Sequence, residues 1–141
     1  MKKSSERMEF ENKCTLYTKG TTFLKILVIY IMPIRMVLLA LTVLAYLRNE
    51  FNYTISTQIF VSIISIIEFI ILYFIRINSL KLNKQGYIGI IGYFSIISIY
   101  NIINNFITYP DLASLVGSVL GTAIIYIPFI VYMKKRKDLF N

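Results

Sequence analysis

Four long apolar blocks alternate with short polar segments along the chain. Each block is at least about 20 residues long, which is the length of α-helix that crosses the hydrocarbon core of a bilayer. The pattern predicts transmembrane spans at 23–47, 55–77, 87–107 and 112–133. The expected fold is an all-α membrane protein, a four-transmembrane-helix bundle with short outer loops.

The segments outside these blocks are polar and basic. Residues 1–22 are predicted to be a mobile or surface-lying cytoplasmic segment, with a short interfacial helix that uses Met8 and Phe10 as the alternative. Residues 134–141 are predicted to be a basic cytoplasmic tail. The first span is too long, and begins too far into the chain, to be a cleaved signal peptide. We therefore expect it to stay in the membrane.

Basic residues indicate the orientation. Of the fifteen lysines and arginines, thirteen lie before or within the first residues of span one, at or after the end of span two and before span three, or after span four. Loops that carry an excess of Lys and Arg stay in the cytoplasm. The prediction is a multi-pass protein with both termini cytoplasmic.

Composition excludes several classes of protein. Hydrophobic residues make up 57% of the chain and charged residues 16%, whereas a soluble domain has roughly 25% charged residues. The net charge of +8 sits in clusters between apolar blocks, so we expect no nucleic-acid partner. With one cysteine, Cys14, and no histidine, the chain can form no internal disulfide, no metal site of the usual Cys/His type and no histidine-based acid–base chemistry. We expect no cofactor, no catalytic residue and no enzyme activity. Cys14 is predicted to be a reduced thiol, with lipidation as the alternative.

Two ionisable residues lie inside spans. Arg35 is near the middle of span one, and Glu68 is the only acid within any span. An arginine at the centre of a bilayer costs at least about 2.5 kcal/mol, so it needs a partner. We predict an Arg35–Glu68 ion pair, which either locks two helices together or forms a ligand site.

Polar residues recur at helical spacing on three spans. The steps of three and four place each set on one helix face. The positions are Thr42 on span one, Gln58, Ser62 and Ser65 on span two, and Ser95, Ser98, Asn101 and Asn105 on span three. We predict one shared polar interior, which is either a cavity open to the outside or a set of interhelical hydrogen bonds.

Prolines and glycines indicate bends and close packing. Pro33 and Pro128 lie inside spans, where each removes a backbone hydrogen bond and is expected to kink its helix. Gly117 and Gly121 are four residues apart, a spacing that permits close helix contact. The expected contact is the glycine-containing face of span three; dimerisation is the alternative.

Three short patches resemble a known family. They are Ile31-Met32-Pro33-Ile34-Arg35, the span-two Glu68, and the end of the chain from Tyr126-Ile127-Pro128-Phe129 to Phe140. The chain is similar here to the DUF2569 group of small four-helix bacterial inner-membrane proteins. The resemblance implies a bacterial cytoplasmic membrane location and supports the choice of Arg35, Glu68 and Pro128. It implies no activity.

Size and lack of a soluble domain favour a non-catalytic accessory or interaction subunit that contacts the lipid bilayer and a larger membrane protein or complex. The alternative is a small-ligand or lipid-binding or transport protein that uses Arg35 and Glu68. A third hypothesis is immunity against a membrane-active peptide. A homodimer is compatible with the sequence but not indicated by it.

Overall fold

The computed structural model describes residues 2–17, 20–48 and 54–140. This described part consists of helices and connecting turns, without a strand. The elements are α1 (Lys2–Leu16), α2 (Thr22–Ile26), the π-helical turn η1 (Leu27–Ile31), α3 (Met32–Leu47), α4 (Ile55–Leu80), α5 (Lys84–Thr108), α6 (Leu112–Lys134) and the 3-10 turn η2 (Lys137–Leu139).

Four helical segments are long and apolar enough to cross a membrane. They are Thr22–Leu47, Ile55–Leu80, Lys84–Thr108 and Leu112–Lys134. The first is continuous through α2, η1 and α3, and every predicted boundary lies within three residues of the observed one. The chain is thus a multi-pass membrane protein, as predicted. The predicted loop between spans one and two falls largely on residues 49–53, outside the described residues.

Side-chain caps fix where α4 and α6 begin. The Thr54 hydroxyl accepts a hydrogen bond from the Thr57 backbone N–H at 3.4 Å, and Asp111 Oδ1 accepts one from the Ser114 N–H at 2.7 Å. Such caps satisfy backbone donors that have no partner within the helix. Because Pro110 precedes the second cap, the chain turns sharply between α5 and α6.

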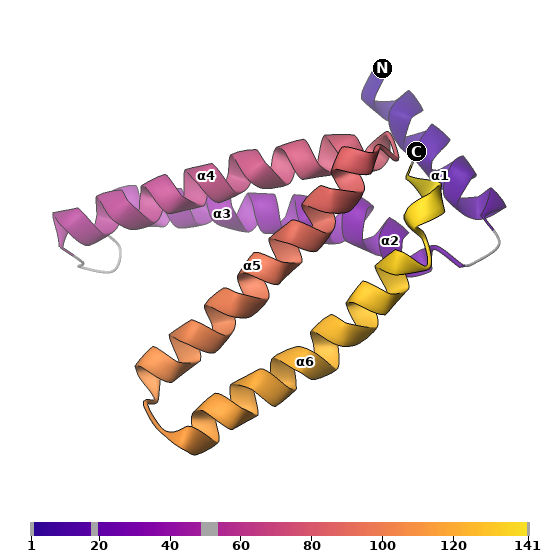
Figure 1. The fold of residues 1–141 in the computed structure, drawn as a ribbon. Coiled ribbons are helices and arrows are strands. Elements are labelled where there is room, and N and C mark those ends of the chain that lie inside the picture. The colour runs from indigo at the N-terminus through magenta and orange to yellow at the C-terminus, as the bar shows by residue number, and fades with distance from the viewer. Residues whose placement is uncertain (1, 18–19, 49–53, 141) are drawn as a thin grey trace.

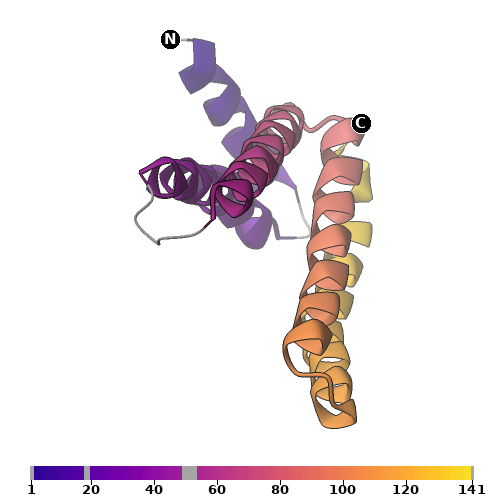
Figure 2. The ribbon, with the colours of Figure 1, turned by 90° about the vertical axis from the view of Figure 1, so that its left-hand side faces the viewer.

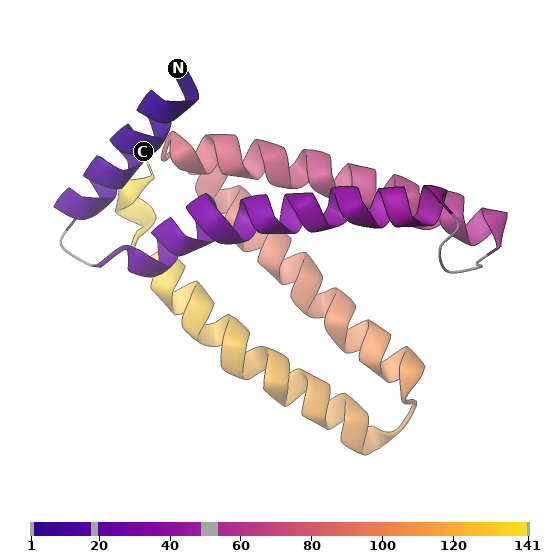
Figure 3. The ribbon, with the colours of Figure 1, turned by 180° about the vertical axis from the view of Figure 1, so that it is seen from behind.

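The four spans form two antiparallel hairpins. α3 lies along α4, and α5 lies along α6 (Figure 1). The hairpins share one end and then diverge, as the views along the first hairpin and from behind show (Figures 2 and 3). The four predicted helical spans are therefore present, but they do not pack together as the single four-helix bundle that was predicted. The two hairpins diverge because α5 packs on α4 only near the connection between them and packs on α6 over the rest of its length.

The core lies at the shared end of the hairpins. There α1 packs on α4, with Phe10 fully buried and Cys14 2% exposed. The N-terminal segment Lys2–Leu16 is therefore a helix, as in the alternative prediction; burial of Phe10 holds it against the hairpins, while Met8 is 56% exposed. Its place at a membrane interface stays a prediction.

The C-terminal tail also joins this core. Arg136 is 9% exposed; its Nε donates to the Gly20 carbonyl at 2.6 Å, and its guanidinium carbon lies 3.5 Å from the centre of the Tyr132 ring. Gly20 has a φ of +61°, a backbone conformation that glycine adopts without strain. Phe140 is 4% exposed. The predicted basic tail is therefore a packed segment that ties the C-terminus to the start of span one.

Candidate functional site

The predicted intramembrane ion pair is present. Arg35 Nε donates to Glu68 Oε1 at 3.0 Å, and Arg35 Nη2 donates to Glu68 Oε2 at 3.2 Å. Arg35 Nη2 also lies 2.9 Å from Glu68 Oε1. Two N–H···O bonds, one to each carboxylate oxygen, fix both the distance and the orientation of the two groups. The pair joins α3 to α4 about half-way along each span, so opposite charges meet where the surrounding medium is hydrocarbon.

Tyr93 of α5 completes this site. Its hydroxyl donates to Glu68 Oε1 at 2.6 Å, so one carboxylate is shared by an arginine from α3 and a tyrosine from α5. Sequence reasoning missed Tyr93 because a tyrosine inside a span is usually part of the packing surface. The only available signal was its place on the helix next to Glu68, at a similar depth from the α4–α5 turn.

The backbone below Arg35 is irregular, and Pro33 explains why. In η1 the Met32 N–H bonds to the Leu27 carbonyl, five residues back. The next donor in that register would be residue 33, which is proline and has no N–H. The Val28 carbonyl is consequently left for another donor, and Arg76 Nε of α4 binds it at 3.3 Å. The irregularity that was expected near Pro33 is thus the π-helical turn η1. Arg76 binds the first span from α4 and is not part of the loop between spans two and three.

Ser65 of span two faces α3, where it lines a hollow together with Leu39 and Val43. Ser62 and Ser65 are 7% and 5% exposed, and the Ser62 hydroxyl has no hydrogen-bond partner among the described residues. Thr42 donates to the carbonyl of Leu38 in its own helix at 2.9 Å. Gln58 is half-buried near the N-terminal end of α4. These residues belong to the first hairpin alone.

The polar residues of span three face α6 instead. The Ser95 hydroxyl donates to the Ile91 carbonyl at 2.8 Å and also bonds to the Tyr126 hydroxyl. Ser98, Asn101 and Asn105 line hollows between α5 and α6. The predicted single polar interior is therefore wrong: the stripes of α4 and α5 point to different partner helices because the hairpins diverge.

A polar groove runs along the tip half of the second hairpin. We call it the asparagine groove; its volume is about 460 Å³, and its principal lining residues are Asn101, Asn104, Asn105, Gly117, Ser118 and Gly121. A Cβ added to Gly117 or Gly121 would meet nothing within 4 Å. Glycine and serine side chains are too short to fill the space between the helices, so the groove stays open.

The predicted packing of Gly117 and Gly121 on α5 is therefore wrong. Two glycines of α5 pack closely on α4 instead. A Cβ at Gly86 would lie 2.6 Å from the Asn78 backbone, and one at Gly89 would lie 2.8 Å from the Ile75 side chain. Only 6% of the most apolar stretch of α6 is buried, the lowest share of the four spans. α6 is thus the least covered helix, contrary to the expectation that it is tightly packed.

A second hollow lies nearer the shared end, between α2, α5 and α6. We call it the aromatic pocket; its volume is about 330 Å³, and it is lined chiefly by Phe23, Phe94, Ser98, Tyr126, Phe129 and Tyr132. Pro128 lines it too and lies inside α6 without ending the helix. The kink expected at Pro128 stays a prediction.

In the described ranges, no three His, Cys, Asp or Glu side chains gather as they would around a metal ion. No known protein family, characterised protein or solved structure matches this chain. The resemblance to the DUF2569 group therefore stays a prediction. Any functional conclusion must come from the three features above: the ion pair, the asparagine groove and the aromatic pocket.

Proposed function

We propose that this protein is a non-catalytic accessory subunit of the bacterial inner membrane, with both termini in the cytoplasm. Its role is to bind a transmembrane helix of another membrane protein in the asparagine groove. The supporting observation is that Asn101, Asn104 and Asn105 are exposed on α5, within a segment that is long and apolar enough to span a bilayer.

The cost of exposed amides favours a partner. An amide moved from water to hydrocarbon without a hydrogen bond loses roughly 4–8 kcal/mol. Asparagines near the outer end of a span escape part of that cost at the interface, but Asn101 lies two turns from the end of α5. A neighbouring helix that supplies donors and acceptors removes the remaining cost.

The lining of the groove defines the partner's chemistry. Its principal lining residues carry no charge, and Gly117 and Gly121 let another backbone approach closely. A complementary helix presents small residues together with Ser, Thr, Asn or Gln. A charged helix face would leave its charge unpaired in this groove.

Filling the groove tests the proposal. The protein is tagged at its native expression level, cross-linked in membranes and purified in mild detergent. We expect Gly117→Leu to reduce recovery of the partner at least about fivefold, because helix–helix contacts need the small residue. The matched control is Gly92→Leu, since an added Cβ at Gly92 also meets nothing within 4 Å but lies outside the groove.

Two results would contradict this function. One is recovery of the wild-type chain alone, or cross-linked only to a second copy of itself. The other is equal loss of partner in Gly117→Leu and Gly92→Leu. Circular dichroism and size-exclusion profiles of both variants confirm that the fold is kept.

A second candidate function is the binding of an amphiphilic anion at Arg35. The side chain of Arg35 is 47% exposed, against 22% for Glu68, and its Nη1 donates to no described residue. Arginine pairs well with carboxylate or phosphate, so such a ligand competes with Glu68 for the guanidinium.

The competition gives two variants opposite effects. In thermal-shift titrations with decanoate, Glu68→Gln is expected to strengthen the ligand-induced shift, because it removes the competing charge, while Arg35→Gln abolishes it. If both variants change the shift in the same direction, Arg35 and Glu68 only hold the helices together.

A further inference from the structure

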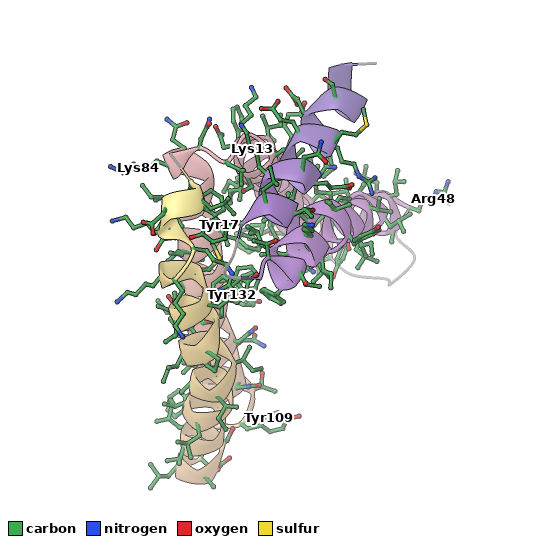
Figure 4. All side chains as sticks on the ribbon, turned by 90° about the vertical axis from the view of Figure 1, so that its right-hand side faces the viewer. Lys13, Tyr17, Arg48, Lys84, Tyr109 and Tyr132 are labelled. Carbon is green, nitrogen blue, oxygen red and sulfur yellow. The ribbon has the colours of Figure 1, made fainter. Side chains whose placement is uncertain are left out.

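The aromatic pocket has apolar walls whose geometry is well defined. The Phe94 and Phe129 rings lie 4.5 Å apart between centres, and Phe23 of α2 packs edge-on against Tyr132 at 5.3 Å. These contacts join α2, α5 and α6 around one hollow. Figure 4 shows Tyr132 in this region of the molecule, below Lys13 and Tyr17.

The hydroxyls of both tyrosines in the pocket already have partners. Tyr126 bonds to the Ser95 hydroxyl, and the Tyr132 oxygen accepts the Leu24 backbone N–H at 3.1 Å. With these groups engaged, the pocket offers a visiting molecule mainly ring faces and aliphatic carbon. Its natural occupant is therefore hydrocarbon.

The size and position of the pocket suit one chain of a lipid. A volume of about 330 Å³ is near the lower limit for a small-molecule site, which starts at about 300 Å³. It holds part of one acyl chain and excludes a whole phospholipid. Ile125 lines the pocket and is 75% exposed, so the opening faces the bilayer side of α6.

The same face of α6 becomes basic beyond the pocket. Positions 125, 128, 129 and 132 line the pocket, and the three-residue step that follows reaches Lys135. The Tyr17 hydroxyl holds the Lys135 backbone by donating to its carbonyl at 3.4 Å. The Lys135 side chain is exposed and has no partner among the described residues. Arg136, next to it, is already engaged with Gly20 and Tyr132.

We propose that the aromatic pocket binds one acyl chain of an anionic phospholipid whose phosphate contacts Lys135. The order of features along α6 matches the order of parts in such a lipid: an apolar chain, then an interfacial tyrosine, then a cation at the headgroup. This site lies beside the asparagine groove, with which it shares the lining residue Ile125, and it is separate from the Arg35–Glu68 pair.

Tryptophan reporters test the proposal, because the chain contains no tryptophan. Ile125→Trp places a reporter at the mouth of the pocket; Ile124→Trp is the matched control, since Ile124 is 73% exposed and does not line the pocket. Both variants are reconstituted in phosphatidylcholine nanodiscs that contain about 5% phosphatidylglycerol with brominated acyl chains, which quench tryptophan on contact. We expect at least about twofold stronger quenching at position 125 than at 124.

Two further substitutions, each with a control substitution, test the two halves of the site in the Ile125→Trp background. Ser98→Phe fills the pocket and is expected to reduce quenching to the level of the control, whereas Ile96→Phe, at an exposed position outside the pocket, leaves it unchanged. Quenching is also measured in nanodiscs in which phosphatidylcholine carries the bromine, and the difference between the two lipids gives the lipid preference. Lys135→Gln is expected to remove the preference for phosphatidylglycerol, and Lys134→Gln is expected to keep it. Equal quenching at 124 and 125, or quenching that survives Ser98→Phe, overturns the proposed chain site. A lipid preference that Lys135→Gln leaves unchanged overturns the headgroup contact.

Discussion

At the scale of single residues, Cys14 shows how tertiary packing decides chemistry. It is 2% exposed near the end of α1, and its carbonyl accepts a hydrogen bond from Thr21 Oγ1 at 2.7 Å. Burial raises the pKa of the Cys14 thiol above its ordinary value, because the thiolate is poorly solvated there. The reactive species is the thiolate, so this thiol is both hidden and protonated.

We therefore expect Cys14 to react slowly with maleimide in the folded protein. At pH 8 its rate is predicted to be at least about tenfold below that of a cysteine at position 16, measured as Leu16→Cys in a Cys14→Ser background. Leu16 lies on the same helix and is 83% exposed, which makes it a matched control. Raising the pH towards the elevated pKa of Cys14 makes the thiolate fractions of the two cysteines more similar. It does not change the burial of Cys14, which still keeps maleimide away from the thiol. Equal rates at pH 8 would contradict the burial of Cys14. Rapid labelling of Cys14 would favour the lipidation hypothesis.

The sequence was a good guide to the Arg35–Glu68 pair and a poor one to its surroundings. Glu68 is the only acid inside any predicted span. The pairing could therefore be predicted from the free-energy cost of leaving Arg35 unpaired in hydrocarbon. Tyr93 and Arg76 could not be predicted in the same way. A tyrosine in a span has many uses, and an arginine near a span end is ordinarily counted as a topology signal. Only the register of α4 against its two neighbours shows what these side chains contact.

At the scale of elements, glycines on α5 and α6 have opposite roles. Gly86 lies against the backbone of Asn78 and Ser79, where an added methyl group has no space, whereas Gly117 faces an open groove. The sequence predicted close packing from glycine spacing but could not say which helix each glycine meets. Spacing defines a helix face, and the choice of partner depends on the angle between the hairpins.

Alanine substitutions separate the two roles. Gly86→Ala is expected to destabilise the protein by about 1–3 kcal/mol, since backbone atoms cannot move aside cheaply. Gly117→Ala is expected to be neutral or to stabilise the helix by up to about 1 kcal/mol, because alanine has the higher helix propensity. Reversible unfolding in mixed micelles, followed by circular dichroism, measures both. Similar stability of the two variants would mean that α4 and α5 are not in close contact at Gly86.

At the scale of the whole molecule, the four spans and their boundaries could be read from hydropathy, because span length is set by bilayer thickness. The divergence of the hairpins could not. Hairpin contacts arise between neighbours in sequence, whereas the angle between hairpins depends on a few contacts such as Glu68 with Tyr93.

The proposed orientation places residue 112 on the outer side of the inner membrane and residue 137 in the cytoplasm. In a Cys14→Ser background, Leu112→Cys is expected to react with a membrane-impermeant maleimide on intact cells, because Leu112 is 76% exposed at the start of α6. Lys137→Cys is expected to react only after the cells are permeabilised. The reverse pattern would invert the topology predicted from the basic residues.

The divergent hairpins also give the protein an asymmetric footprint. At the shared end, α1, α2 and the C-terminal segment gather around one core, while the opposite ends of α3 and α4 lie far from the turn between α5 and α6 (Figures 1 and 3). With both hairpins in a bilayer, the molecule displaces more lipid area in one leaflet than in the other. Any change in the angle between the hairpins changes that difference in area, so lateral tension and the curvature of the membrane act directly on this angle.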